Sequence, residues 1–586
     1  MIDQDYVQRT KHLFEVAQGK KQAHQAVTQA TLANVYTGEM LENQTICIWD
    51  EWIAYVGQNP GPAIGSDTEI IDAAGKPVIP GLIDAHTHMS ERYTADAFLE
   101  HVIPGGTTAI VTETVEPFAV DGYDGVVDFM NSLAGQPIHF FGTAPPSASI
   151  SPNFPPIPVD EVQKLLSRAD IIGLGESFWQ ALLNDPDRLL PVFEAVLLNG
   201  KLLEGHSAGA ADNKLNAYVA AGISSCHEPI QAQEALDRLR LGLYVMIREG
   251  SIRRDLQEIA ALAKTEGDSR RLILVTDGIS PKDLLEKGYM EYVVQKAMDS
   301  GFSFMQAVQM ATLNPATHFN LDHMIGGIAP GRYADLSILP DASTIQPDLV
   351  IGKGRIIARH GRCLAVPRVH QFQPRSMDSV HLPAPLTATD FQIPINDGRD
   401  EVTLRAINMI TDLVSAEAHV TLPVMGGNIT ADPSQDIGKI AAINRTNNPG
   451  QMFVGLIRGF GMKSGAFASS TGWDLADIIA IGATDSDLAL AVNRIADLKG
   501  GVVVCSDGRV TAELALPVMG LMTNDTIQDL AASLDSITSE LHTLGVTFRD
   551  PLLALSALTG AAIPFLRICE QGLVNLKTGP CSLIVS

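Results

Sequence analysis

The sequence has few cysteines, few basic residues and no long apolar run, and each shortage excludes a class of protein. Its six cysteines among 586 residues form no Cys-x-x-Cys pair, which argues against a disulfide scaffold and fits free thiols in a reducing compartment. Lysines and arginines number 41 against 67 acidic residues, a net charge of −26, so nucleic acid is not an expected partner. No apolar stretch reaches the roughly 18 residues that span a bilayer, and the polar N-terminus shows no signal peptide. We therefore expect a cytoplasmic protein without a membrane partner.

What the chain does contain is typical of a globular protein of several domains. Hydrophobic residues make up 46% and charged residues 18%, which excludes a disordered or collagen-like chain. The length predicts about four domains, or fewer if one of them is a large barrel.

Short apolar runs, each followed by polar residues and mostly by a helical pattern, recur eight times. They lie at residues 78–84, 108–112, 138–142, 171–174, 201–203, 222–225, 243–247 and 272–275. Continuous apolar runs indicate strands buried on both faces, and eight such units are typical of an α/β fold, the (β/α)8 TIM barrel. The rival, an open doubly wound sheet, calls for a Gly-x-Gly-x-x-Gly turn after the first strand, and the sequence has none there.

Shorter strand patterns with turn residues lie on either side of this region, and they can pair into one β domain. A proline-containing stretch then precedes a region of mixed strand and helix patterns. The predicted domains are an N-terminal helical segment at 1–24, a composite β-sandwich at 25–80 plus 326–365, the barrel at 81–325, a linker at 366–395 and a C-terminal α/β domain at 396–586.

Polar residues stand at the C-terminal ends of these runs, which is where a barrel places its active site. The first run ends in His86 and His88, and a strand's period of two points both imidazoles to one side. Later runs end near further possible ligands, which are Glu176, His206, His227 and Asp277. Imidazole nitrogens and carboxylate oxygens suit divalent ions. We predict that these six residues hold two metal ions, with Glu176 as a bridge.

A pair of metal ions can generate hydroxide near neutral pH from the water that they share. The bridging hydroxide would attack an electrophilic carbon, and Asp277 would move the proton to the leaving group. The predicted catalytic residues are Asp277, Glu176 and His227. Predicted substrate contacts at the same rim are Glu91, Glu116, Glu228, Arg248 and Glu249.

Several segments resemble the amidohydrolase superfamily and, within it, the bacterial adenine deaminase family. Residues 80–88 are similar to the first-strand signature of the superfamily. Similarity to the adenine deaminase family lies at residues 216–228, 241–251, 328–335, 459–461 and 491–494. The resemblance covers roughly residues 25–586 and implies a metal-dependent barrel, a composite β-sandwich and an extra C-terminal domain. It also implies hydrolysis of adenine to hypoxanthine and ammonia, with manganese or iron at the site and zinc as the alternative. By motif position it assigns the metal-ligand roles to the same six residues. We also expect a small heterocyclic substrate and a homo-oligomer.

The chain departs from the usual motifs of that family at positions that could face the substrate. After the first histidines the family usually has Ile-Glu-Ser-Ser, whereas residues 89–92 read Met-Ser-Glu-Arg. Val115 replaces a histidine, Gly278 replaces a second acid after Asp277, and Trp473 and Ala476 replace two histidines of the C-terminal domain. A site that hydrogen-bonds one heterocycle discriminates through such groups, so the sequence predicts the reaction type more firmly than the substrate.

Other interpretations remain open from the sequence. Hydrolysis of another cyclic amidine or amide by the same two metal ions is the nearest. A serine hydrolase is another, because residues 205–209 fit the Gly-x-Ser-x-Gly elbow around Ser207, with Asp277 and His318 following in order. A metal-storing or scaffold protein is the non-enzymatic alternative, and the intact set of six ligands argues against it.

Overall fold

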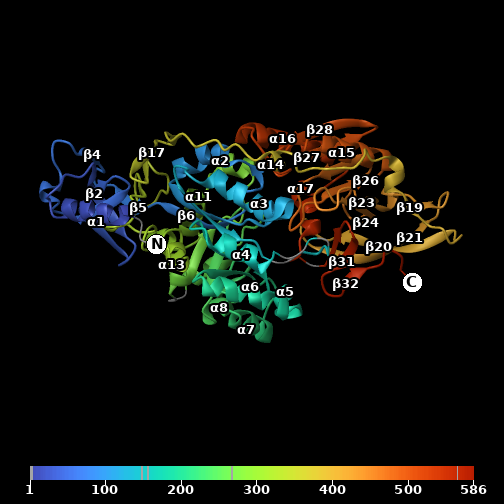
Figure 1. The fold of residues 1–586 in the computed structure, drawn as a ribbon, viewed down its shortest axis with the longest axis horizontal. Helices are drawn as coiled ribbons and strands as arrows, with labels where there is room; N and C mark the ends of the chain where they lie inside the picture. The colour runs from blue at the N-terminus through green and yellow to red at the C-terminus, as the bar shows by residue number, and fades with distance from the viewer. Residues whose placement is uncertain are drawn as a thin grey trace.

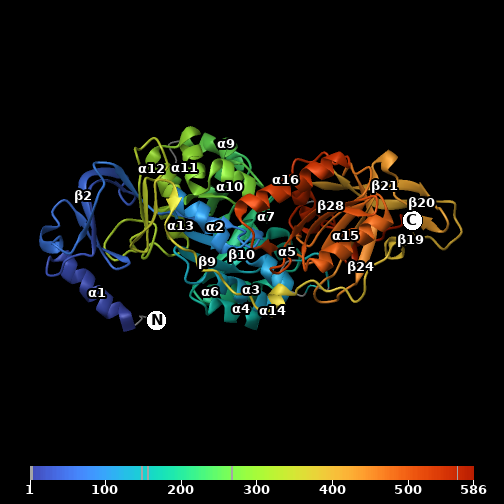
Figure 2. The same ribbon diagram turned by 90° about the horizontal axis from the view of Figure 1, so that it is seen from above.

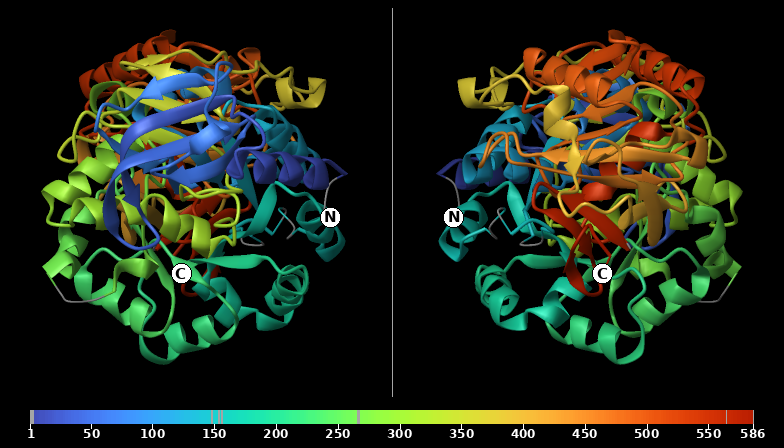
Figure 3. Two further views of the ribbon diagram at one scale, coloured as in Figure 1. Left: turned by 90° about the vertical axis from the view of Figure 1, so that its left-hand side faces the viewer. Right: turned by 90° about the vertical axis from the view of Figure 1, so that its right-hand side faces the viewer.

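A computed structural model describes residues 4–146, 149–152, 154, 157–264, 268–563 and 565–585. The chain runs along the long axis of an elongated molecule, with a β-rich part at each end and a part of alternating strands and helices between them (Figures 1 and 2). Figure 3 views the molecule from its two ends, with the N-terminal strands in front in the left picture and the C-terminal strands in front in the right picture. Among the described residues, no helix combines the length and the apolar character needed to cross a bilayer.

The N-terminal end is one nine-stranded sheet built from two distant stretches of chain. Its strands are β1 (Gln25–Asn34), β2 (Glu39–Trp49), β3 (Trp52–Gly57), β4 (Glu69–Asp72), β5 (Pro77–Pro80), β15 (Leu336–Ile338), β16 (Leu349–Gly352), β17 (Arg355–Arg359) and β18 (Arg362–Cys363). The antiparallel pair β5–β15 joins the two stretches. Helix α1 (Gln4–Ala17) buries Leu13 and Val16 against this part, beside Trp52. The stretches on the two sides of the middle part thus meet in one hydrogen-bonded ladder.

The middle part contains eight parallel strands at the positions of the eight apolar runs. They are β6 (Leu82–Thr87), β8 (Thr107–Thr112), β9 (His139–Ala144), β10 (Ile171–Phe178), β11 (Leu202–His206), β12 (Ser225–Cys226), β13 (Tyr244–Arg248) and β14 (Leu272–Val275). Most of their apolar side chains are buried on both faces, as in β14, all four of whose residues are buried. Each of the eight apolar runs therefore overlaps one of these strands.

The hydrogen-bonded ladders differ from the expected single barrel, because they form one sheet of five strands and another of three. Side chains replace backbone partners where the two sheets meet. Gly205 N donates to Ser225 Oγ at one seam, and Thr276 N donates to Asp84 Oδ1 at the other. Single backbone bonds still cross both seams, from Ser224 N to Leu203 O and from Asp277 N to His86 O. The two sheets are therefore adjacent without a continuous ladder.

Helices alternate with these strands and cover their outer side. The helices of this part are α2 (Ala95–Val102), α3 (Val115–Leu133), α4 (Val159–Leu166), α5 (Trp179–Asn184), α6 (Pro186–Leu198), α7 (Asp212–Ala220), α8 (Ala232–Arg240), α9 (Leu256–Ile259), α10 (Pro281–Lys287), α11 (Met290–Asp299), α12 (Phe304–Met310) and α13 (Leu313–His318). Because the strands are parallel, their carboxyl ends all lie at one rim.

The C-terminal part is a mostly antiparallel sheet of eight strands with helices packed on it. In order, its strands are β21 (Ser415–Pro423), β20 (Glu401–Met409), β24 (Met452–Arg458), β23 (Ile437–Ile443), β26 (Ile478–Gly482), β25 (Ala466–Ser469), β27 (Gly501–Ser506) and β28 (Arg509–Ala515). Its main helices are α15 (Asp485–Asp497), α16 (Ile527–Thr543) and α17 (Pro551–Ser556). A short parallel pair, β7 (Arg92–Tyr93) with β29 (Met522–Thr523), joins this part to the rim.

Candidate metal centre and active site

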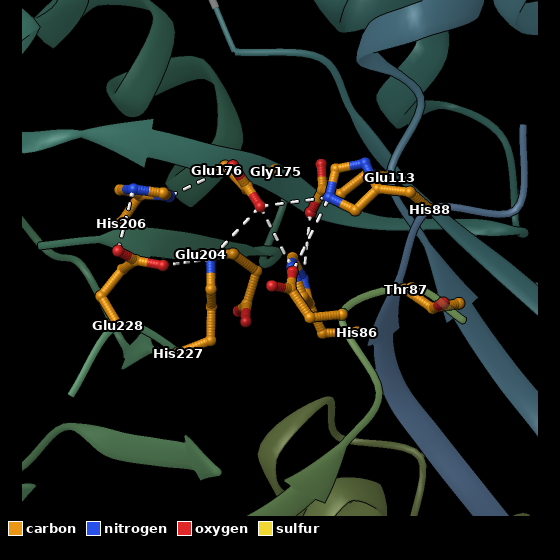
Figure 4. Close-up of polar contacts among 12 residues, drawn as sticks. His86, Thr87, His88, Glu113, Gly175, Glu176, Glu204, His206, His227 and Glu228 are labelled. Atoms are coloured by element: carbon orange, nitrogen blue, oxygen red, sulfur yellow. Dashed lines mark hydrogen bonds and ion pairs between the residues drawn. The ribbon is translucent and has the colours of Figure 1, made fainter. Parts of the chain in front are cut away.

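Strand ends bring the predicted ligands together, with four histidines around the carboxylate of Glu176 (Figure 4). The sixth ligand, Asp277, lies with its Oδ1 3.1 Å from His86 Nε2. Glu176 Oε1 lies 3.1 Å from His86 Nε2, 3.3 Å from His88 Nε2 and 3.2 Å from His227 Nε2. Its Oε2 lies 3.2 Å from His206 Nδ1. Glu176 therefore stands between the histidines of the first strand and those of the fifth and sixth.

Two groups of donor atoms are close enough to surround metal ions, and Glu176 belongs to both. One group is His86, His88, Glu176 and Asp277, and the other is Glu176, His206 and His227, with the atoms of each group within 4.8 Å of one another. Nitrogen and carboxylate donors in this arrangement suit borderline or hard divalent ions. The donor set therefore fits two cations sharing one carboxylate.

The charges around this cluster also call for cations. Five carboxylates pair with histidines of the cluster, those of Glu113, Glu116, Glu176, Glu228 and Asp277, and among the described residues the one guanidinium in contact with them is that of Arg248. Burial opposes ionisation of Glu176, but the surrounding histidines hold the pKa of its carboxyl well below the usual range. Buried carboxylates require compensating charge. Although burial opposes it, they raise the pKa of His86, His88 and His206, and metal ions bound to the neutral imidazoles would provide the same compensation.

Glu116 and Glu228, which the sequence analysis placed in substrate contact, line the cavity but also orient metal-facing histidines. Glu116 Oε1 lies 2.7 Å from His88 Nδ1, and Glu228 Oε2 lies 3.2 Å from His206 Nε2. In each case the carboxylate binds the ring nitrogen that faces away from Glu176. Such partners fix the orientation of a ligating imidazole and raise its basicity.

Glu113 has a similar position behind His86, although it was not among the predicted site residues. Its Oε1 lies 3.5 Å from His86 Nδ1, and Thr143 Oγ1 donates to its Oε2. Burial raises the pKa of Glu113 to about 7. The only signal in the sequence was its place directly after the second apolar run.

Arg248 and Glu249, at the end of β13, face opposite ways because side chains alternate along a strand. Arg248 Nη1 donates to Glu228 Oε1 and, at 3.3 Å, to Asp277 Oδ2, and its Nε donates to Asp255. Glu249 does not line the cavity; the cations nearest its carboxyl are Lys296, Arg254 and Lys287. Arg248 thus orients the acidic groups of the site, while Glu249 lies outside it.

Asp277 is held in an unusual backbone conformation between the first and eighth strands. Its φ is +60°, which is uncommon for a residue with a side chain. The bond from its N–H to His86 O stabilises this turn. Below it, Asp84 Oδ2 accepts hydrogen bonds from Thr276 Oγ1 and Tyr289 OH. This buried network positions Asp277 at the cavity.

A cavity of about 250 Å³ lies over the cluster, and both the middle and C-terminal parts line it. Predicted residues on its wall include Glu91, His88, Glu176, His206 and Asp277, and the C-terminal part contributes Leu413, Val414, Trp473, Asp474, Gly560, Ala562 and Ile563. Asp474 was not predicted, and burial raises the pKa of its carboxyl to about 7. The C-terminal part therefore closes one side of the site.

The serine hydrolase interpretation is wrong, because its three residues do not contact one another. Ser207 Oγ lies 2.8 Å from Cys226 Sγ and accepts a hydrogen bond from Arg238 Nε, and Ser207 is fully buried. His318 instead binds both carboxylate oxygens of Glu204. Ser207 is therefore a structural residue below the rim.

We expect Ser207→Ala to keep kcat within about threefold of wild type, because Ser207 lies outside the metal cluster. The change removes only one of the acceptors that bind the buried Arg238 guanidinium. That guanidinium keeps its bonds to backbone carbonyls of Ser207 and Ala210. The predicted cost is about 1 kcal/mol of unfolding free energy. Steady-state assays with a thermal melt measure both, and complete loss of activity with metal retained would contradict this assignment.

Comparison with known proteins agrees with this geometry. Residues 78–357 match the amidohydrolase family, and residues 412–579 match the adenine deaminase C-terminal domain. The chain is 37% identical over 576 residues to an adenine deaminase of Moorella thermoacetica, covering 97% of this chain and 96% of that protein. It is 33% identical over 572 residues to an adenine deaminase of Cenarchaeum symbiosum, covering 96% and 93% respectively. With identity at this level along almost the whole length, the chain belongs to the adenine deaminase family of the amidohydrolase superfamily.

Proposed function

We propose that this protein is a metal-dependent deaminase that hydrolyses adenine, or a closely related aminopurine, to hypoxanthine and ammonia. The single observation that carries the proposal is the pair of donor groups sharing Glu176 at the base of a cavity. The relatives named adenine deaminase support the choice of substrate. The volume of about 250 Å³ lies below the usual range for drug-sized ligands and suits a single base.

Two divalent ions would be held by His86, His88, Glu176, His206, His227 and Asp277. When bound, such ions act as Lewis acids and make water acidic enough to supply a nucleophile near neutral pH. We expect manganese or iron, with zinc as the alternative, because all three accept mixed imidazole and carboxylate ligands.

The side chains of the site would then orient the substrate and move the proton. Asp277 Oδ1 faces the histidines and Oδ2 accepts from Arg248, so the carboxylate is held in one orientation. Its role is to take a proton from the attacking water and pass it to the departing amine. His227, which is buried with its Nε2 3.2 Å from Glu176 Oε1, would take part in the reaction as a ligand of one of the ions.

Hydrolysis of another cyclic amidine or amide is the second candidate, because residues that depart from the family motifs line the cavity. Glu91, Val115 and Trp473 all contribute to its wall. These changes alter the substrate side of the cavity, whereas the ligands around Glu176 are all present.

The experiment that tests the proposed function is ammonia release from a panel of aminopurines, cyclic amidines and hydantoin-like rings on manganese-loaded protein. We expect the highest kcat/KM for a 6-aminopurine. If only ring-opened products form, the second candidate replaces the first.

Glu176→Gln should lower the metal content from two ions per chain to one, because an amide loses the charge that a shared ligand supplies. The measurement is elemental analysis of purified protein, with Glu194→Gln on the exposed side of α6 as a control. Two ions retained in Glu176→Gln would mean that Glu176 is not the bridge.

We also propose that the two parallel sheets form one (β/α)8 barrel and that the domains divide at 1–24, 25–80 with 326–365, 81–325, 366–395 and 396–586. The backbone hydrogen bonds across both seams support the closed barrel. The nine-stranded sheet that joins β5 to β15 supports the composite β domain.

We propose a homo-oligomeric assembly as well, which sedimentation can test.

A further inference from the structure

One hydrogen bond crosses from the rim to the C-terminal part inside the wall of the cavity. Trp473 Nε1 donates to Glu91 Oε1 at 3.0 Å, and the two residues are 382 positions apart. Both are positions at which the chain departs from the motifs of its family, and both line the cavity. The two departures therefore form a single contact in space.

The backbone on each side of this contact is anchored. Next to Glu91, the N–H of Arg92 donates to Leu521 O at the start of the β7–β29 pair. The carbonyl of Trp473 accepts from Thr559 Oγ1. A side chain at Gly560 would come within 3.4 Å of the Trp473 indole, so the indole lies directly over that glycine. The wall is thus held in place before any ligand binds.

Asp474, the next residue, adds a second carboxylate to this wall. Its Oδ2 accepts from Ala561 N at 2.8 Å, and its side chain is 8% exposed. Within the described part of the chain, no hydrogen bond is made to Asp474 Oδ1 or to Glu91 Oε2. Two carboxylate oxygens at the cavity thus lack donors.

A ligand that fills the cavity displaces water from these two oxygens. It therefore binds better when it brings N–H donors to them, because an acceptor that is buried without a partner is costly. A donor on the ligand also favours the ionised form of a carboxyl. A planar base resting beside the indole would present its edge, where its N–H groups lie, to these oxygens.

We propose that Glu91, Trp473 and Asp474 form a specificity-determining wall that selects purine bases carrying an N–H donor in addition to those of adenine, such as a 2-amino group. This inference rests on the proposed function, since it concerns the substrate of the same site. The wall recognises the ring, whereas the cluster around Glu176 carries out the hydrolysis.

The test compares adenine with 2,6-diaminopurine, which has the same reacting amine and one further amino group. Burial raises the pKa of Asp474 to about 7, so the assay is run above pH 8, where this carboxyl is ionised. In wild type we expect kcat/KM for 2,6-diaminopurine to exceed that for adenine by about tenfold, which corresponds to one hydrogen bond to a charged acceptor. Most of this difference should appear in KM. Asp474→Asn and Glu91→Gln, which each replace an acceptor oxygen by an amide donor, should bring the ratio to about one.

Trp473→Phe should also lower the ratio, because Glu91 loses the donor that orients it. Trp49→Phe, which changes an indole in β2 far from the cavity, should leave the ratio unchanged. A thermal melt with guanine or hypoxanthine, the two products, gives a readout without turnover; guanine should stabilise wild type more than it stabilises Asp474→Asn.

A wild-type ratio of one or less would overturn the inference while leaving deamination of adenine intact. A ratio that stays near tenfold in both Asp474→Asn and Glu91→Gln would also overturn it, whatever their melting temperatures. If wild type releases ammonia from neither base, the proposed function itself fails, and this outcome is distinct from the other two.

Discussion

Asp277→Asn should lower kcat by about three orders of magnitude while metal remains bound. The amide keeps an oxygen that can ligate a cation, but it cannot accept the proton from water, and general acid–base groups contribute about 10²- to 10⁴-fold. Asp277 lies 3.1 Å from His86 Nε2 and 3.3 Å from Arg248 Nη1. Among the described residues, no other carboxylate makes both of these contacts, so none can take over its role. Steady-state kinetics with elemental analysis on the same sample would measure both effects.

The control for this variant is Asp237→Asn on the exposed face of α8, which makes the same chemical change away from the site. We expect that control to match wild type in kcat and KM. An Asp277→Asn enzyme within tenfold of wild type would refute the role of Asp277 in proton transfer.

Removing the metal should abolish turnover entirely, and manganese or iron should restore it best. Five carboxylates surround the cluster against one guanidinium, so the stripped site keeps its charge but loses the Lewis acid that supplies the nucleophile. Stripping should also lower the melting temperature, because the free energy of metal binding then no longer stabilises the folded state. The measurements are ammonia release, metal content and thermal melts before and after chelation.

A matched pair of histidine variants separates metal loss from general damage. His88→Gln removes a cluster ligand and should bind less metal, whereas His419→Gln changes an exposed histidine in β21 and should bind as much as wild type. Full activity in a sample shown to be free of metal would remove the central hypothesis.

Parts of the site that depend on local pattern were predictable from sequence. The period of two in a strand placed His86 and His88 on one side, and parallel strands brought Glu176, His206, His227 and Asp277 to the same rim. The same periodicity could have separated Arg248 from Glu249, since adjacent strand residues face opposite ways. The elbow around Ser207 misled because a short motif carries no information about which residues lie next to it in space.

The sequence by itself determined the strand positions, the cluster of Glu176 with five further ligands, and the family, because buried strands and their carboxyl ends have a local signature. Only the tertiary structure decided that Glu116 and Glu228 orient histidines and that Trp473 meets Glu91 in the wall of the cavity. Contacts between residues hundreds of positions apart follow from how the C-terminal part docks on the rim. That docking is set by packing and by the β7–β29 pair, for which no periodicity in the chain provides a signal.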